Sequence, residues 1–310
     1  MTRHFLEIDD ASPAELASIL ARARTGGVRP LEGAGVALVM GLPSARTRNS
    51  TEMAVVDLGG HPIAMGAAEI GIDTRETAED VARTLAQYHR VLCVRVHDHG
   101  VLVRMAAALD ASSFDVPVVN LLSSAGHPVQ ALADVLTLAD EVGGAGQVGM
   151  RVAWVGDANN VALSLALAAV GVGMHVTTAS PEGYRFAEYD VARIERYAEL
   201  AGLGGAFAQS DSPREAVEGA AAVCTDVCVS MGQEAERAAR LAAFDGYRVD
   251  DALLEAAGHD AVLLHCLPAH RGEEVTAEAI DGKRSRVWEQ AANRRVAMRG
   301  LLAWLVEDAR

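Results

Sequence analysis

The sequence has few aromatic residues and few cysteines. Phe, Trp and Tyr make up 4% of the 310 residues, whereas apolar residues make up 50%. The core must therefore be built mainly from Ala, Val and Leu. The four cysteines are too few for a disulfide framework in a chain of this length. We therefore expect a protein of the cytoplasm.

Positive charge and long apolar runs are also scarce. Lys and Arg number 27 against 42 Asp and Glu, which gives a formal net charge of −15. This balance argues against binding to nucleic acid or to an anionic membrane surface. It still allows a small anionic ligand, because a local cluster of arginines can reverse the field. No run approaches the roughly 18 apolar residues of a membrane span, and the first residues turn acidic too soon for a signal peptide.

Short apolar runs alternate with helical patterns along the chain. A first helix is predicted after Ser12, where Ser12 and Glu15 form a capping box around Pro13. Helices are also expected near 50–58, 77–88 and 99–109. Buried strands are expected at 36–40, 91–96, 116–119, 152–155, 175–178, 223–227 and 261–264. This alternation predicts mostly parallel sheets with helices on both faces.

The length predicts two domains, at roughly 100–200 residues each. We expect a first domain over 1–142 and a second over 143–288, with a last helical run at 289–310 that packs back on the first. The glycine-rich stretch 144–149 fits the dinucleotide pattern G-x-G-x-x-G. It follows a helix and precedes a strand, however, so it favours a linker over a nucleotide site. The expected fold class is α/β, with two doubly wound parallel-sheet domains and an interdomain cleft.

Polar residues recur where the expected strands end. Ser44 and two arginines follow the first strand, which is typical of an anion site at a helix N-terminus. Arg95 ends another strand, and His127 begins a helix after a third. In the second half, polar groups follow three strands, at 157–160, 226–232 and 265–268. Because open α/β sheets bind ligands at the carboxyl ends of their strands, these positions indicate a small polar substrate held between the domains.

Four of these segments resemble motifs of the aspartate/ornithine carbamoyltransferase family. They are Ser44-Ala45-Arg46-Thr47-Arg48, His127-Pro128-Val129-Gln130, Ser230-Met231-Gly232 and His265-Cys266-Leu267-Pro268. The last two are typical of the ornithine branch of that family. The resemblance implies a first domain for carbamoyl phosphate, a second for the amino acid, and a homotrimer. It implies no cofactor and no metal, and neither Cys224 with Cys228 nor His97 with His99 has the spacing of a metal-ligand set.

The resemblance also implies roles for individual residues. Carbamoyl phosphate would be bound by Ser44, Ala45, Arg46, Thr47, Glu69, Arg95, His127, Gln130, Cys266, Leu267 and Arg294. Ornithine would be bound by Asn160, Asp226, Ser230 and Met231. Arg95 and His127 would act catalytically on the carbonyl group, while Cys266 and Asp226 would act on the attacking amine.

Several positions depart from the family pattern on the carbamoyl phosphate side. Ala45 stands where the family usually has Thr, and Glu69 where many relatives have Gln. A carboxylate beside a phosphate is repulsive, and Arg75 is a candidate for the missing positive contact. Ala292 replaces a Glu that is common in the family.

The resemblance implies carbamoyl transfer to the side-chain amine of L-ornithine, giving L-citrulline and phosphate. Two alternatives stay open from the sequence. One is transfer to another amine, such as acetylornithine, lysine or putrescine. The other is a catalytically weak paralogue that only binds ligands, and the departures above are its only support.

Overall fold

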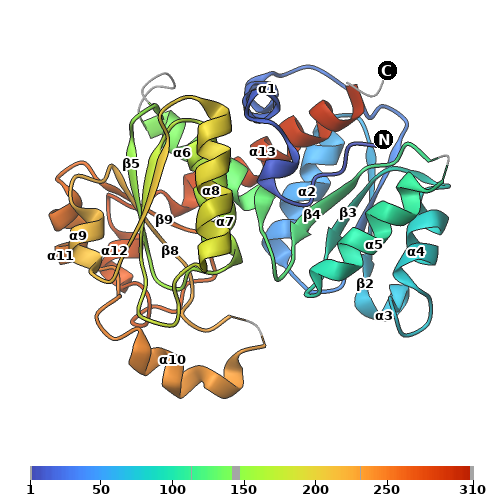
Figure 1. The fold of residues 1–310 in the computed structure, drawn as a ribbon. Coiled ribbons are helices and arrows are strands. Elements are labelled where there is room, and N and C mark those ends of the chain that lie inside the picture. Colours follow the sequence, from blue (N-terminus) through green and yellow to red (C-terminus); the bar gives the residue numbers. More distant parts are fainter. Residues whose placement is uncertain (1, 113, 142–146, 231, 308–310) are drawn as a thin grey trace. The chain divides into compact units, whose positions relative to one another are not determined.

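The computed structural model describes residues 2–112, 114–141, 147–230 and 232–307 (Figure 1). The chain forms two compact units, one of Met1–Ala133 with Ala292–Arg310 and the other of Asp134–Ala291. Residues 144–146 of the expected linker lie outside the described residues. The expected boundaries at residues 142 and 288 stay a prediction.

The first unit contains a four-stranded parallel sheet. Its strands are arranged in the order β2 (His61–Gly66), β1 (Gly35–Met40), β3 (His89–Arg95) and β4 (Val118–Leu122). β2 follows β1 in the sequence and pairs with one side of it, whereas β3 pairs with the other side of β1. The strand order therefore reverses between β1 and β3, and in open α/β sheets ligands bind at the carboxyl ends of strands at such a point.

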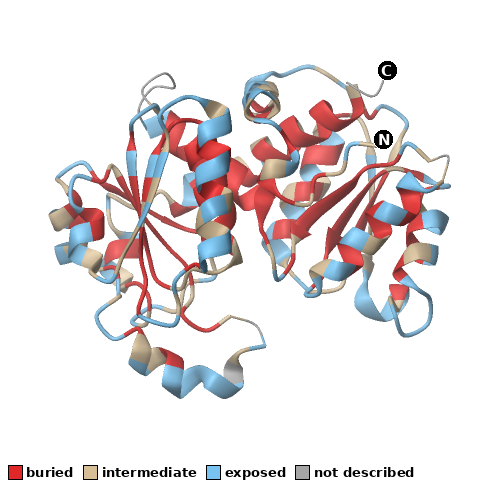
Figure 2. Cartoon of the chain, viewed as in Figure 1, coloured by how far each residue is buried: buried red, intermediate tan, exposed pale blue. Residues whose placement is uncertain are grey.

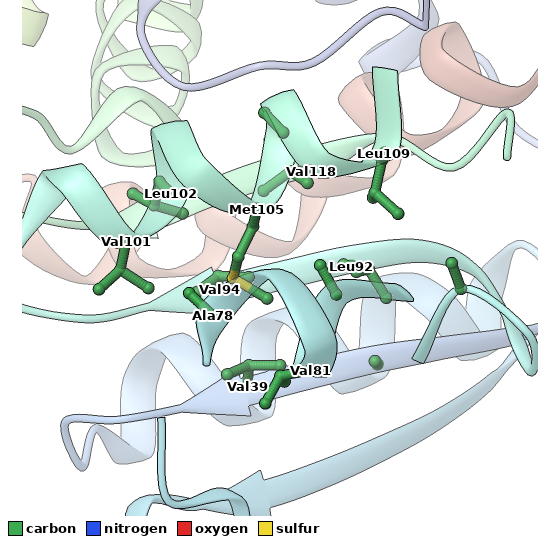
Figure 3. Packing of buried hydrophobic residues seen from close by; sticks show 14 of the residues in the cluster. Val39, Ala78, Val81, Leu92, Val94, Val101, Leu102, Met105, Leu109 and Val118 are labelled. Carbon is green, nitrogen blue, oxygen red and sulfur yellow. The ribbon is translucent and has the colours of Figure 1, made fainter. Parts of the chain in front are cut away.

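Helices cover both faces of this sheet (Figure 1). On one face, α4 (Ala78–Leu85) and α5 (His99–Asp110) pack against alternate residues of β1 and β3. Figure 3 shows Met105 reaching from α5 to Val94 of β3. The helix α2 (Ala45–Asp57) contacts β1 and β2. Two further helices of this unit are α1 (Pro13–Arg24) and the C-terminal part of α13 (Val287–Glu307).

The helices α1 and α13 approach closely at one glycine. A Cβ atom on Gly300 would lie 2.5 Å from the carbonyl oxygen of Ile19. An ion pair between Arg22 of α1 and Glu307 of α13 also joins the two helices. On the other side of α13, Arg295 donates two hydrogen bonds to Asp57 of α2, at 2.7 and 2.5 Å. The C-terminal part of α13 is thus fixed to the helices α1 and α2.

The second unit contains a five-stranded parallel sheet. The order is β7 (Ala206–Ser210), β6 (His175–Ala179), β5 (Arg151–Val155), β8 (Ala222–Thr225) and β9 (Val262–His265). Here the strand order reverses between β5 and β8. The carboxyl ends of these two strands therefore form the second position at which a ligand is expected.

Helices also cover the second sheet. The core on one face includes side chains from α9 (Pro213–Val217), α11 (Asp251–Ala257) and α12 (Ala277–Asp281). The strands β6 and β7 also contact α7 (Asn160–Gly171) and α8 (Glu188–Ala201). In each unit the strands are largely buried and the outer helix faces are exposed (Figure 2). The remaining elements are η1 (Ile8–Asp10), α3 (Ala67–Ile70), α6 (Pro128–Glu141), η3 (Glu234–Glu236) and α10 (Arg237–Ala243).

The predicted fold class of two parallel-sheet α/β domains is confirmed. All seven expected strands are present, and the one expected at 116–119 begins two residues later, at Val118. The sequence analysis missed β2 and β7. Both are edge strands in which exposed and partly buried residues alternate. Among the described residues, no helix is both long and apolar enough to cross a membrane.

Candidate active site

The first group of candidate residues lies at the point of strand reversal in the first unit. Ser44 follows β1 and is the N-cap of α2, where its hydroxyl accepts a hydrogen bond from the Thr47 amide at 3.3 Å. The first turn of a helix presents backbone N–H groups that no helical carbonyl can accept. This end of α2 is therefore suited to an anion. Ala45 and Arg46 begin the helix and are exposed.

Two buried arginines converge on Thr47. Arg95, the last residue of β3, donates from Nη1 to Thr47 Oγ1 at 3.3 Å, and Arg294 of α13 donates from Nη2 to the same oxygen at 3.2 Å. Arg294 Nη1 also donates to Gln130 Oε1 of α6 at 2.6 Å. All four side chains are almost completely buried. Four elements thus bring two fixed positive charges to one hydroxyl group.

His127 lies directly before α6 and is buried in the same unit. Burial holds the pKa of its imidazole well below the usual range, and the nearby charges of Arg294, Arg95 and Arg46 lower the pKa further. The ring is therefore neutral at neutral pH, and one of its nitrogens carries a hydrogen that can be donated to a ligand.

Glu69 lies apart from this buried set. It is exposed on the short helix α3, which follows the edge strand β2. Arg75 donates from Nη2 to the backbone carbonyl of Glu69 at 2.5 Å. Arg75 was the candidate from the sequence for a positive contact with the phosphate. Its guanidinium is bound to the backbone of α3.

The second group lies at the point of strand reversal in the second unit. Asp226 follows β8, and its two carboxylate oxygens accept different hydrogen bonds. Oδ1 accepts from the Cys266 thiol at 3.0 Å, and Oδ2 accepts from Asn159 Nδ2 at 3.0 Å. Asn159 is also the N-cap of α7, where its Oδ1 accepts two backbone N–H groups. Loops after β5, β8 and β9 thus meet at one carboxylate.

The other predicted ornithine residues lie on neighbouring segments. Asn160 is the first residue of α7 and is half-buried. Ser230 is half-buried in a turn, in which its N–H donates to Gln233 Oε1 at 2.9 Å. Met231 lies outside the described residues.

A buried network holds the Cys266–Leu267 segment. His265 Nδ1 accepts a hydrogen bond from the Leu267 amide at 2.8 Å, so its hydrogen lies on Nε2, which donates to Glu274 Oε1 at 3.1 Å. The His265 amide donates to Gln290, which in turn donates to Asp134 at 2.7 Å. The network fixes the backbone of Leu267 at φ +59°, a conformation that residues other than glycine rarely adopt.

Asp226, His265 and Cys266 each offer one metal-ligand atom, and these atoms all lie within 4.8 Å of one another. The hydrogen bonds above already use both nitrogens of His265 and both oxygens of Asp226. A metal ion at this cluster would have to replace some of these bonds. The arrangement is better suited to holding the Cys266 thiol in place than to metal binding.

Two family models match the chain, one over each half. The model described as aspartate/ornithine carbamoyltransferase, carbamoyl-P binding domain, matches residues 3–140. The model described as aspartate/ornithine carbamoyltransferase, Asp/Orn binding domain, matches residues 148–305. The chain belongs to the aspartate/ornithine carbamoyltransferase family. The resemblance carried by the four motifs is therefore confirmed.

Relatives within the family match the chain from end to end. The ornithine carbamoyltransferase of Acidothermus cellulolyticus is 45% identical over 315 residues, covering 100% of this chain and 98% of that protein. The ornithine carbamoyltransferase structure from Pyrococcus furiosus is 38% identical with a TM-score of 0.90, covering 99% of this chain and 98% of that one. The anabolic ornithine carbamoyltransferase structure from Campylobacter jejuni also has a TM-score of 0.90, at 30% identity and full coverage of both chains.

Arg240 of α10 ties the segment after the family's Ser-Met-Gly motif to the loop after β5. It pairs with Asp157, donates from Nε to the Cys228 carbonyl at 2.7 Å, and lies 4.8 Å from the ring centre of Tyr184. Burial raises the pKa of Asp157, and the charge of Arg240 opposes that rise. Arg240 is itself buried, and its contacts join α10 to the loop after β5.

Three residues of this site were not predicted from the sequence, namely Asn159, Glu274 and Arg240. Asn159 had a local signal, since Asn before an apolar helical run is typical of an N-cap. His265 was noted only as part of a motif, and its partner Glu274 carried no signal of its own. Arg240 could not be found, because its partner Asp157 is 83 positions away in the sequence.

Proposed function

We propose that this protein transfers the carbamoyl group of carbamoyl phosphate to the side-chain amine of L-ornithine, giving L-citrulline and phosphate. The observation that carries the proposal is the convergence of Arg95 and Arg294 on Thr47 in the unit matched by the carbamoyl-P model. The full-length similarity to proteins named ornithine carbamoyltransferase supports the same reaction.

We assign carbamoyl phosphate to the end of α2 and the buried arginines beside it. The amides of Ser44, Ala45, Arg46 and Thr47 would bind the phosphate oxygens at the positive end of the helix dipole. Arg95 would contact both the phosphate and the carbonyl oxygen. Gln130 would accept from the carbamoyl amide group, and Arg294 would complete the pocket with its planar pair of donors.

The carbonyl oxygen gains negative charge as the amine attacks. His127, Arg95 and Thr47 would donate hydrogen bonds to that oxygen from positions fixed before the reaction begins. Preorganised donors of this kind are usually the largest catalytic contribution. Because His127 is neutral, it donates a hydrogen bond through its one ring N–H and does not act as a general acid.

The attacking amine must first lose a proton. An alkylamine with a pKa near 10.4 is only about 0.1% neutral at about pH 7.4, which costs roughly 4 kcal/mol. We assign Cys266 and Asp226 to this step, since the carboxylate lies within hydrogen-bond distance of the thiol and would orient the amine. Asn160, Ser230 and Met231 would bind the α-amino and carboxylate end of ornithine.

The reaction balances without a covalent enzyme intermediate. The nitrogen lone pair forms a bond to the carbamoyl carbon, and the bond from that carbon to the phosphate oxygen breaks. The amine gives up one proton before attack, and its next proton leaves with the phosphate as hydrogen phosphate. Carbamoyl phosphate is already activated, so the step needs no cofactor. The Cys266 and Leu267 backbone would contact the carbamoyl group.

Two departures from the family pattern fit this assignment. Ala45 contributes a backbone amide, which does not depend on its side chain. The carboxylate of Glu69 is exposed on α3, where solvent screens its charge from the phosphate. We therefore expect carbamoyl phosphate to bind despite both substitutions.

We also propose a homotrimer in the cytoplasm, with a role in arginine metabolism. Exposed apolar residues on α2 and β2, namely Met53, Val56 and Ile63, support a contact between subunits. All four cysteines are free, which is usual in a reducing compartment. Light scattering should give three times the chain mass of 32.5 kDa, and a strictly monomeric active protein would contradict the trimer.

The acceptor is tested by phosphate release from carbamoyl phosphate with ornithine, N-acetylornithine, lysine, putrescine and aspartate in turn. We expect turnover with ornithine and background rates with the other four. Turnover with a different amine would support carbamoyl phosphate as the donor. It would show that the assignment of Ser230 and Asn160 to ornithine is wrong. A folded protein that is inactive with all five would contradict the proposed enzyme.

A further inference from the structure

A turn after the His-Cys-Leu-Pro motif brings together three side chains that can bind a metal ion. His270, Glu273 and Glu274 each offer one ligand atom, and these atoms all lie within 4.8 Å of one another. The turn is closed by hydrogen bonds from the Glu273 amide to the His270 carbonyl at 2.9 Å and from the Gly272 amide to the Val275 carbonyl at 2.8 Å. One imidazole and two carboxylates therefore share one small region of the second unit.

Each of these side chains also has a buried polar atom that needs a partner. The Glu274 side chain is 0% exposed, and within the described part of the chain its Oε2 has no hydrogen-bond partner. The same is true of His270 Nδ1 and Glu273 Oε2. A buried polar atom without a hydrogen bond destabilises the folded state, and more so when it is charged. His270 Nδ1 and Glu273 Oε2 lie 3.8 Å apart, and a cation bound among the three side chains would give both of these atoms a partner.

The other polar atoms of the two carboxylates are already engaged. Glu274 Oε1 accepts from His265 Nε2 at 3.1 Å and from the His270 amide at 2.6 Å. Glu273 Oε1 pairs with Arg237. Contacts of this kind orient metal ligands, because they fix the position of each side chain around the ion.

The spacing fits a tetrahedral ion after small side-chain rotations. His270 Nδ1 lies 3.8 Å from Glu273 Oε2. Two ligands of a tetrahedral Zn²⁺ ion, at bonds of about 2.1 Å, lie roughly 3.4 Å apart. The His270 side chain is 42% exposed and can make this adjustment without disturbing the core.

We propose that His270, Glu273 and Glu274 form a binding site for a divalent transition-metal ion, with Zn²⁺ as the best match to one imidazole and two carboxylates. A water molecule would complete the tetrahedron. The sequence predicted no metal, from the family resemblance and from the spacing of the Cys224–Cys228 and His97–His99 pairs. The site lies outside the catalytic assignments above, and it does not depend on the proposed reaction.

The proposed ion would act on the fold of the turn. Glu274 links it to His265, which in turn accepts the Leu267 amide. A bound ion would therefore stabilise the turn and, through Glu274, the segment that carries Cys266. A ligand that binds the folded state more tightly than the unfolded state raises the melting temperature.

The test is calorimetric titration of the full chain with ZnCl₂ in phosphate-free buffer. We expect one Zn²⁺ per chain, and we expect His270→Ala and Glu273→Gln each to weaken binding at least tenfold. His259→Ala and Glu278→Gln, which change exposed residues of the same unit, are the matched controls and should bind as the wild type does. Zn²⁺ should raise the Tm of the wild type and leave that of His270→Ala unchanged.

A further variant separates this site from the cluster around Cys266. Cys266→Ser should keep its Zn²⁺ affinity if the turn binds the ion. No saturable uptake by the wild type would overturn the proposal. Loss of binding in Cys266→Ser with retention in His270→Ala would also overturn it. Circular dichroism of every variant checks that it is folded, and none of these outcomes depends on carbamoyl transfer.

Discussion

Thr47 receives hydrogen bonds from two arginines that are far apart in the sequence. Arg95 ends a strand of the first unit, and Arg294 belongs to the last helix of the chain. Burial strengthens the effect of their charges, since a guanidinium interacts more strongly in a low-dielectric environment than in water. This explains how a protein with a formal net charge of −15 can present a strongly positive site.

Replacing Arg294 by Lys tests the geometry of this site while keeping the charge. Lys carries its donors on one nitrogen and lacks the planar pair with which Arg294 reaches Thr47 and Gln130 together. We expect a loss of about 1.5–3 kcal/mol, or roughly 10- to 150-fold in kcat/KM for carbamoyl phosphate. The neighbouring Arg295→Lys, which alters an exposed pair with Asp57, is the control. Equal kinetics in the two variants would rule out the assigned role of Arg294.

Replacing Cys266 by Ser tests the part of the site that is assigned to the attacking amine of ornithine. The thiol donates to Asp226, and we assign this pair to the ornithine amine. We expect kcat to fall strongly while the dissociation constant of carbamoyl phosphate, measured by calorimetry, changes little. Cys266→Ala removes the donor entirely and should be at least as slow. Near-normal turnover in either variant would show that the thiol has no part in the reaction.

The buried neutral His127 predicts a pH-dependent stability. Its pKa is lowered in the folded protein, so below about pH 6.5 the unfolded chain takes up a proton that the folded protein does not. The free energy of unfolding should therefore fall as the pH drops below about 6.5, by up to about 1.4 kcal/mol per pH unit from this residue.

Urea unfolding of the wild type and of His127→Asn at several pH values measures this contribution. His4 and His89 also have lowered pKa values, because both are at least partly buried, but they are common to both proteins. The difference between the two slopes therefore isolates His127. Parallel slopes below pH 6.5 would mean that His127 is protonated in the folded protein.

At the scale of elements, helix starts and central strands were the most predictable features. The Ser12–Glu15 capping box and Pro13 do begin α1, because the capping signal is local in sequence. The central strands β1, β3, β5 and β8 are continuous apolar runs and were all expected. The edge strand β2 begins His61-Pro62, and its exposed positions remove the apolar run that marks a buried strand. β7 was missed for the same reason.

The buried ion pair between Arg240 and Asp157 is expected to help hold α10 in place. In Arg240→Gln, Asp157 keeps its buried carboxylate without the paired charge, and breaking such a pair costs about 3–5 kcal/mol. We expect a raised KM for ornithine and an unchanged dissociation constant for carbamoyl phosphate, since Arg240 belongs to the second unit. Arg214→Gln, on the exposed surface of α9, is the control.

The double variant Arg240→Gln with Asp157→Asn separates a structural collapse from a binding effect. Removing both charges should restore much of the free energy of unfolding, because no buried charge is then left without a partner. The KM for ornithine should stay raised, since the ion pair that joins α10 to the loop after β5 is still absent. An unchanged KM in a folded Arg240→Gln protein would show that α10 does not position the ornithine residues.

At the scale of the whole molecule, each unit places its candidate residues where its strand order reverses. In the first unit these are the ends of β1 and β3, which carry Ser44 and Arg95. In the second they are the ends of β5 and β8, which carry Asn159 and Asp226. The sequence could predict this much, because strand ends and polar turns are local features. It could not predict the pairing of Arg294 with Gln130, which are 164 positions apart.

The most direct measurement of the central claim is the product stoichiometry with L-ornithine. Purified protein would be given L-ornithine and carbamoyl phosphate labelled at its carbon, and both products would be followed over time. The account predicts one labelled L-citrulline for each phosphate released, at a rate that depends on the ornithine concentration. Phosphate release without labelled citrulline would contradict it.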